Sequence, residues 1–216
     1  MIRLIIFDLD GTLLNTIDDL AHCCNYILRK YRLPEHEIDA YRYFVGNGIP
    51  KLIERILPAS LQHDVAFKER VLDEFLSYYE KHKSDLTAPY QGITELLLEL
   101  QQRKIAIAVA SNKVQAAIPP LLAYYFPQIT FVAALGQREG IPLKPDPQIA
   151  FDIMKIADVA QENVLYVGDT GVDMQTANNA NVIGIGALWG FRTEEEIRDA
   201  GAKHVIHTPQ ELLNYL

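Results

Sequence analysis

Apolar residues gather in short continuous runs along this chain, and they do not alternate with polar residues. Such runs are typical of parallel strands that are buried on both faces of a sheet. The predicted strands are Leu4–Phe7, Ile105–Ala110, Ile129–Val132, Val164–Val167, Val182–Gly186 and His204–Ile206. From Gly92 onward the runs alternate with helical patterns, such as the spacing of Ile93, Leu96, Leu97 and Leu100. This order predicts an α/β fold with a doubly wound, mostly parallel, Rossmann-like sheet.

The connection between the first two predicted strands is far longer than a crossover with its helix, which needs roughly a dozen to a few dozen residues. Helical patterns fill it, at Ile17–Tyr31, Lys51–Leu57 and Ala66–Tyr79. Thr16 and Asp19 have the spacing of a capping box at the start of the first helix. We therefore expect an α/β core formed by residues 1–15 and 89–216, and an inserted all-helical cap formed by residues 16–88. Hinges at 14–16 and 84–91 would let the cap close over a site in the core.

Composition and charge narrow the class of partner. The 216 residues are 49% hydrophobic and 22% charged, which is ordinary globular usage. The net charge of −8 and the lack of a Lys/Arg cluster argue against nucleic acid or an anionic membrane as a partner, and leave a small molecule. The only cysteines, Cys23 and Cys24, are adjacent and are interpreted as part of an apolar helix face. No secretory signal or membrane span is apparent, so we expect a cytoplasmic protein.

Polar residues follow four of the predicted strands, and the carboxyl ends of parallel strands are where open α/β sheets bind ligands. The residues in these positions are Asp8-Leu9-Asp10-Gly11-Thr12, Ser111-Asn112-Lys113, Lys144-Pro145 and Gly168-Asp169 with Asp173. Crowded carboxylates repel one another unless a cation neutralises them, and Mg²⁺ prefers oxygen ligands. Asp169 and Asp173 are spaced to share one face at a helix start. Lys144 and Ser111 supply a positive charge and a donor for phosphoryl oxygens, and the amides of Gly11 and Thr12 can point inward.

These four segments, in this order and spacing, resemble the four motifs of the haloacid dehalogenase superfamily, whose first cap class carries a helical insert at this position. The resemblance implies that Asp8 is a nucleophile that forms an aspartyl-phosphate and that Asp10 is the general acid/base. It also implies that the Asp8 side chain, the Asp10 backbone carbonyl and Asp169 hold Mg²⁺, with Asp173 as a metal residue that lies near the ion or is linked to it through water. The resemblance implies that Ser111 and Lys144 bind the phosphate, and Gly11, Thr12 and Asn112 beside them are further candidate phosphate-binding residues. Dehalogenases lack the second aspartate, so Asp10 indicates phosphoryl transfer.

Within the insert, Tyr43-Phe44-Val45-Gly46-Asn47-Gly48 resembles the cap segment of phosphoglycolate phosphatases. The candidate substrate-specificity residues are Gly46, Asn47, Gly48 and Lys51. Arg42 or Lys51 could meet a substrate carboxylate, whereas Arg55 is as readily a solvated helix residue. The Lys144-Pro145-Asp146-Pro147 sequence is shared with pyrophosphatase-like and sugar-phosphatase relatives.

The resulting hypothesis is a Mg²⁺-dependent phosphatase acting on a small phosphorylated metabolite such as 2-phosphoglycolate. The alternatives are a pyrophosphatase or sugar-phosphate phosphatase, a β-phosphoglucomutase-type mutase, and a non-catalytic phosphate-binding regulator. No pattern in the sequence indicates the oligomeric state.

Overall fold

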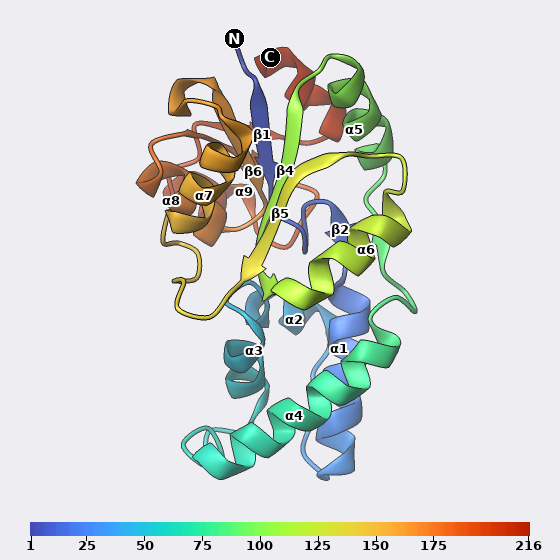
Figure 1. The fold of residues 1–216 in the computed structure, drawn as a ribbon. Helices are drawn as coiled ribbons and strands as arrows, with labels where there is room; N and C mark the ends of the chain where they lie inside the picture. The colour runs from blue at the N-terminus through green and yellow to red at the C-terminus, as the bar shows by residue number, and fades with distance from the viewer. The chain divides into compact units, whose positions relative to one another are not determined.

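The computed structural model describes residues 1–216, which form two compact units (Figure 1). The first unit combines Met1–Leu14 with Pro89–Leu216, and the second is Asn15–Ala88. The chain passes between them in two short strands that pair with each other, β2 (Leu14–Asn15) and β3 (Ala88–Pro89). The second unit is therefore an insertion into the first.

The first unit is built on a six-stranded sheet with the order β5-β4-β1-β6-β7-β8, in which every pair of neighbours is parallel. Its strands are β1 (Leu4–Phe7), β4 (Ala106–Val114), β5 (Phe131–Gln137), β6 (Val164–Gly168), β7 (Ile183–Ala187) and β8 (His204–Ile206). Its helices are α5 (Ile93–Gln102), α6 (Ile118–Tyr125), α7 (Gln148–Ala157), α8 (Gly171–Asn179) and α9 (Glu194–Asp199), with 3₁₀ turns η1 (Gln115–Ala117), η2 (Gln161–Asn163) and η3 (Pro209–Tyr215). The predicted fold class is confirmed.

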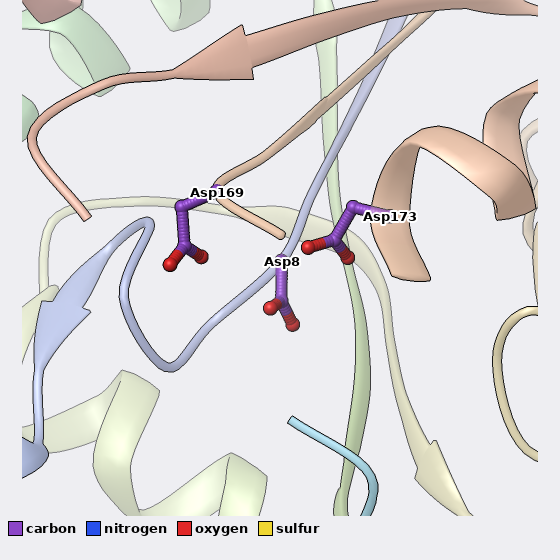
Figure 2. A group of neighbouring side chains, drawn as sticks. All are labelled: Asp8, Asp169 and Asp173. Atoms are coloured by element: carbon purple, nitrogen blue, oxygen red, sulfur yellow. The ribbon is translucent and has the colours of Figure 1, made fainter. Parts of the chain in front are cut away.

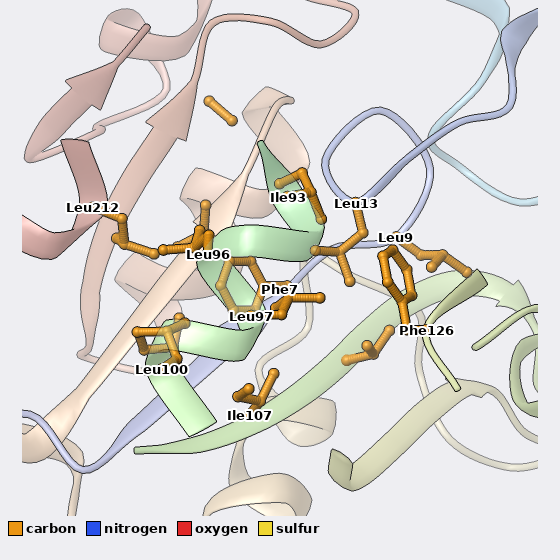
Figure 3. Close-up of a cluster of buried hydrophobic side chains, with 14 of the residues drawn as sticks. Phe7, Leu9, Leu13, Ile93, Leu96, Leu97, Leu100, Ile107, Phe126 and Leu212 are labelled. Atoms are coloured by element: carbon orange, nitrogen blue, oxygen red, sulfur yellow. The ribbon is translucent and has the colours of Figure 1, made fainter. Parts of the chain in front are cut away.

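Both faces of the sheet are buried, which explains the continuous apolar runs. On β1, Ile5 and Phe7 belong to a cluster with α5 and α6, whereas Leu4 and Ile6 belong to a second cluster with α7 and α8. Figure 3 shows Leu96, Leu97 and Leu100 of α5 in the first cluster, close to Phe7. Each fully buried side chain of this size stabilises the fold by about 1.5–3 kcal/mol relative to leaving it exposed.

The strand order places a crevice at the centre of the sheet. From β1 the chain continues to β4 and β5 on one side, and then returns to β6, β7 and β8 on the other. The order thus reverses between β1 and β6, and such a switch point opens a crevice beyond the carboxyl ends of the two strands. Asp8 follows β1 and Asp169 follows β6, so both lie at this crevice.

Two strands, β4 and β5, differ from their predicted bounds by more than one residue. The run predicted at Ile129–Val132 precedes most of β5, which extends through Gln137. Strand β4 continues past Ala110 over three polar residues, with a shift in its register against β5 between Ala110 and Val114. Those polar residues are buried in the site described below, so hydrophobicity did not mark the end of β4.

The second unit is all-helical, with α1 (Ile17–Lys30), α2 (Ile38–Phe44), α3 (Ile49–Ile56) and α4 (Val65–His82). Cys23 and Cys24 are buried in α1 as free thiols, as the apolar pattern predicted. Burial, followed by the nearby carboxylates of Asp19 and Asp85, raises the pKa of the Cys23 thiol to about 12, so the thiol stays protonated near neutral pH. No helix of either unit combines the length and the apolar character needed to span a bilayer.

The capping box predicted from Thr16 and Asp19 is wrong. Thr16 precedes α1, but its hydroxyl makes no capping hydrogen bond and is buried without a partner. The Asp19 carboxylate instead accepts hydrogen bonds from the Leu86 amide (2.9 Å), the Thr87 amide (2.9 Å) and the Thr87 hydroxyl (2.6 Å). The Asp19 side chain, which the local pattern assigned to capping, therefore binds a segment that is distant in sequence. This contact holds the two ends of the insert together.

The first unit also holds its own ends together at the insertion point. The Tyr90 amide donates a hydrogen bond to the Leu13 carbonyl oxygen at 3.2 Å. Each unit therefore closes the gap between its two chain segments with contacts of its own.

Candidate active site

Three carboxylates from separate elements meet at the crevice (Figure 2). Asp8 follows β1, Asp169 follows β6, and Asp173 lies in the first turn of α8. All three are buried, and one oxygen of each lies within 4.8 Å of one oxygen of the others. Asp173 is fixed by a capping box, since its Oδ2 accepts from the amide (3.1 Å) and hydroxyl (2.7 Å) of Thr170. Asp169 precedes Thr170 and lies outside the helix, so the two aspartates do not share a helix face as predicted.

Burial and mutual repulsion dominate the electrostatics of these carboxylates. Burial raises the pKa of Asp8 well above its usual range, the charge of Asp173 raises it further, and Lys144 opposes the change. Burial and Asp173 raise the pKa of Asp169 to about 7, against hydrogen bonds from Phe191 and Thr12. The neighbouring groups therefore do not offset the cost of ionising these carboxylates together. A hard divalent cation with oxygen ligands fits this donor set.

Lys144 is the cation of the cluster. Its Nζ lies 2.9 Å from Asp8 Oδ1 and 2.7 Å from Asp173 Oδ1, and it donates to the Ala110 carbonyl oxygen at 2.9 Å. Its side chain is only 2% exposed. Burial disfavours the charged form, but the carboxylates of Asp173 and Asp8 outweigh it and raise the pKa of Lys144. The ammonium group therefore stays charged.

Asn112 positions Lys144. Its Oδ1 accepts from the Lys144 amide at 2.9 Å, and its Nδ2 donates to the Lys144 carbonyl oxygen at 3.2 Å. The carboxamide thus pairs with both backbone groups of Lys144, a role that the sequence did not predict, and its expected contact with phosphate stays a prediction. This pairing joins the end of β4 to the segment before α7.

The loop after β1 is held by backbone hydrogen bonds. The amide of Gly11 donates to Leu14 O (2.8 Å) and that of Thr12 to Leu9 O (3.4 Å), so both amides close the loop with hydrogen bonds to its own backbone. Gly11 has a φ of +92°, and a Cβ there would lie 2.3 Å from Asp169 Oδ2. Only glycine allows this loop to approach Asp169 so closely.

The carboxylate of Asp169 is held from two sides. Thr12 Oγ1 donates to its Oδ1 and the Phe191 amide donates to its Oδ2, both at 2.8 Å. The indole Nε1 of Trp189 donates to Thr12 O at 3.0 Å. Trp189 and Phe191 follow β7, another strand end at the same edge of the sheet. This position after a strand is the signal in the sequence that points to a role at the site.

Asp10 lies outside the three-carboxylate cluster and has its own counter-ion. Lys113 Nζ lies 3.1 Å from Asp10 Oδ1 and 3.2 Å from Oδ2. The side chain of Lys113 is 3% exposed and that of Asp10 is 15% exposed. The Lys113 amide donates to Ser111 Oγ at 3.2 Å, so Ser111 is buried beside the same residue. Lys113 was not among the candidate site residues, although it stands in the polar run at the end of β4.

In the second unit, the loop between α2 and α3 is built around Arg55. Its guanidinium donates to the carbonyl oxygens of Tyr43 (3.3 Å) and Phe44 (2.9 Å) and to Asn47 Oδ1 (2.8 Å). Gly46 and Gly48 flank Asn47 with φ values of +113° and +83°. The interpretation of Arg55 as a solvated helix residue is therefore wrong, because its guanidinium is held by the loop.

The other two basic candidates of the insert form surface ion pairs with neighbours on their own helices. Lys51 pairs with Glu54 at 2.5 Å, and Arg42 pairs with Asp39 at 3.3 Å. Exposed pairs of this kind contribute about 0–1 kcal/mol and are easily exchanged for another partner.

The buried aspartates and lysine lie where open α/β sheets bind ligands, and comparison with known proteins identifies the chain as a hydrolase. Residues 5–187 match the profile of the haloacid dehalogenase-like hydrolases, and the chain belongs to this family.

Among its relatives, the phosphoglycolate phosphatase of Pseudomonas syringae pv. tomato is 34% identical over 215 residues, which cover 98% of this chain and 78% of that protein. Phosphoglycolate phosphatase 1 of Pseudomonas aeruginosa is 30% identical, with the same coverage. A crystal structure from Lactobacillus delbrueckii subsp. bulgaricus, of a protein provisionally named a phosphoglycolate phosphatase, matches with a TM-score of 0.90 at 29% identity and covers 99% of this chain and 97% of that one. The chain is thus a phosphoric monoester hydrolase, and the alternative of a non-catalytic regulator is not supported.

Proposed function

We propose that this phosphatase hydrolyses a small phosphomonoester through an aspartyl-phosphate on Asp8, with Mg²⁺ as cofactor. The observation that carries the proposal is the buried Asp8 carboxylate at the end of β1, 2.9 Å from Lys144 Nζ and beside Asp169 and Asp173. The side chains of Asp8, Asp169 and Asp173, with the backbone carbonyl of Asp10, would hold the ion. Bound Mg²⁺ would polarise a phosphoryl oxygen and offset its charge.

The residues of the chain divide the reaction into two displacements. Asp8 attacks phosphorus while Asp10 protonates the departing alkoxide. Asp10 then takes a proton from the water that attacks the aspartyl-phosphate, and Asp8 is regenerated. Lys144 and Ser111 bind the phosphoryl oxygens, where the fixed positive charge and the hydroxyl stabilise charge that develops during transfer.

For the substrate we propose 2-phosphoglycolate. The support is the set of phosphoglycolate phosphatases that are 30–34% identical over nearly the whole chain. We further propose that the second unit acts as a cap and that Gly46, Asn47, Gly48 and Lys51 contribute to substrate selection. A carboxylate two bonds from the ester oxygen is the group that distinguishes this substrate from other small phosphomonoesters.

A substrate panel tests this proposal. We expect kcat/KM to be higher for 2-phosphoglycolate than for pyrophosphate, sugar phosphates or nucleotides. We also expect the release of phosphate to require Mg²⁺. Asp8→Asn should abolish turnover of every substrate, including p-nitrophenyl phosphate. If another compound in the panel has a higher kcat/KM, the proposal of 2-phosphoglycolate as the substrate is wrong. If Asp8→Asn keeps residual turnover, the proposal of an aspartyl-phosphate on Asp8 is wrong.

A further inference from the structure

The pairing of Lys113 with Asp10 is not accounted for by the phosphate and metal chemistry. We propose that Lys113 is the positioning residue of Asp10, holding its carboxylate in the orientation from which it exchanges protons with the leaving group and the water. This inference rests on the proposed function, because it takes Asp10 as the general acid/base.

The geometry leaves Asp10 little freedom except in its side chain. Its backbone is fixed by a bridge to Leu14, and the next amide, that of Gly11, donates to Leu14 O at 2.8 Å. A terminal carboxylate otherwise rotates in a broad two-fold well. Lys113 Nζ contacts both oxygens at nearly equal distances, 3.1 and 3.2 Å, and so fixes the direction in which the carboxylate points.

The charges of the site show why a second lysine is needed. Lys144 is already shared between Asp8 and Asp173. Lys113 has Asp10 as its ion-pair partner, and a buried ammonium is tolerated only when it is paired. The two lysines therefore pair with different carboxylates: Lys144 with those of Asp8 and Asp173, and Lys113 with that of the general acid/base, Asp10.

The position of Lys113 depends on the irregular end of β4. The register with β5 shifts between Ala110 and Val114, and the Lys113 amide is bound back to Ser111 Oγ. A regular strand would continue its ladder through these residues. The irregularity aims Lys113 toward the loop after β1, so one short segment presents both the phosphate-binding Ser111 and the positioning residue.

The test compares two leaving groups. Protonation by Asp10 matters for the alkoxide of 2-phosphoglycolate and much less for p-nitrophenolate. Lys113→Met removes the charge at similar length and should lower kcat on 2-phosphoglycolate by about 10- to 100-fold, with a loss of at most about three-fold on p-nitrophenyl phosphate. In the Asp10→Asn background, Lys113→Met should cause less than about a two-fold further loss on 2-phosphoglycolate, because the group that it positions is already gone.

Controls separate positioning from folding. A smaller fraction of folded enzyme lowers both activities equally and leaves their ratio unchanged. Lys155→Met, on the exposed surface of α7, should keep the wild-type ratio. Lys113→Arg, which keeps the charge but alters the contact, should give an intermediate ratio and serves if the Met variant does not fold.

Each failure has its own signature. If Asp10→Asn itself loses the same factor on both substrates, the acid/base role of Asp10 fails, and the inference fails with it. If Asp10→Asn discriminates between the substrates while the Lys113 variants do not, or if the losses multiply in the double variant, only the positioning role of Lys113 is overturned.

Discussion

The hydrogen bond from Thr12 to Asp169 links the loop after β1 to the carboxylate cluster, and Thr12→Val tests what that link contributes. Valine has nearly the same shape but no hydroxyl, so the substitution removes the 2.8 Å bond to Asp169 Oδ1 and leaves the amide of Phe191 on Oδ2. Thr12 is fully buried, so water does not replace the donor. The carbonyl of Thr12, which accepts from Trp189, is untouched.

The magnitude follows from the type of bond. A hydrogen bond to a charged group contributes about 1.5–3 kcal/mol, which corresponds to roughly 10- to 150-fold in an equilibrium constant. Loss of a partner that orients a metal ligand typically costs about 10- to 100-fold in metal affinity or activity. We therefore expect Thr12→Val to raise the Mg²⁺ concentration at half activity by about 10- to 100-fold.

The assay is a Mg²⁺ titration of p-nitrophenyl phosphate hydrolysis, with thermal unfolding as a measure of folding. Thr12→Ser restores the hydroxyl and should recover most of the affinity. If the Mg²⁺ concentration at half activity in Thr12→Val stays within about two-fold of wild type, or if the Ser variant is as weak as the Val variant, the orienting role of Thr12 is refuted.

Three further predictions concern other contacts. Asp10→Asn should lower kcat by about 10²- to 10⁴-fold for alkyl phosphates and by less for p-nitrophenyl phosphate, and equal losses in steady-state assays would contradict the acid role. Asp19→Ala should lower the free energy of unfolding in urea by about 2–4 kcal/mol, because the donors of Thr87 lose their acceptor, and Asp19→Asn should cost less. In Mg²⁺-free buffer the folded protein keeps a proton on Asp169 up to a pH of about 7, whereas the unfolded chain loses this proton near pH 3.8. Raising the pH between these values should therefore lower the free energy of unfolding. In denaturation curves, Asp169→Asn should make the free energy of unfolding depend less on pH over this range.

The fold was predictable where a single physical cause produces the pattern. Burial on both faces gives the continuous apolar runs of β1 and β6, and the overlong connection after β1 revealed an insertion. The end of β4 was not predictable in this way, because Ser111, Asn112 and Lys113 are polar and yet buried. Their burial depends on partners from distant segments, which local hydrophobicity does not record.

The site was predictable in membership and less so in detail. The positions after the strands identified Asp8, Lys144, Asp169 and Asp173 as neighbours, and the structure brings them together. The partner of each polar atom was not predictable, because it depends on distances of a few tenths of an ångström. The carboxamide of Asn112, for example, pairs with the backbone of Lys144, and no local pattern in the sequence indicates this contact.

The closure of each unit at the insertion point has a consequence for the history of such enzymes. Asp19 ties the ends of the insert to each other, and Leu13 and Tyr90 tie the ends of the core. The bond between Leu13 and Tyr90 lies within the core, so a genetic exchange that replaces the insert leaves this bond in place and interrupts only the short β2–β3 pairing at the joint. The insertion point is therefore a position at which evolution can exchange the helical segment for one of another length and another substrate preference, while the phosphoryl-transfer residues of the core stay the same.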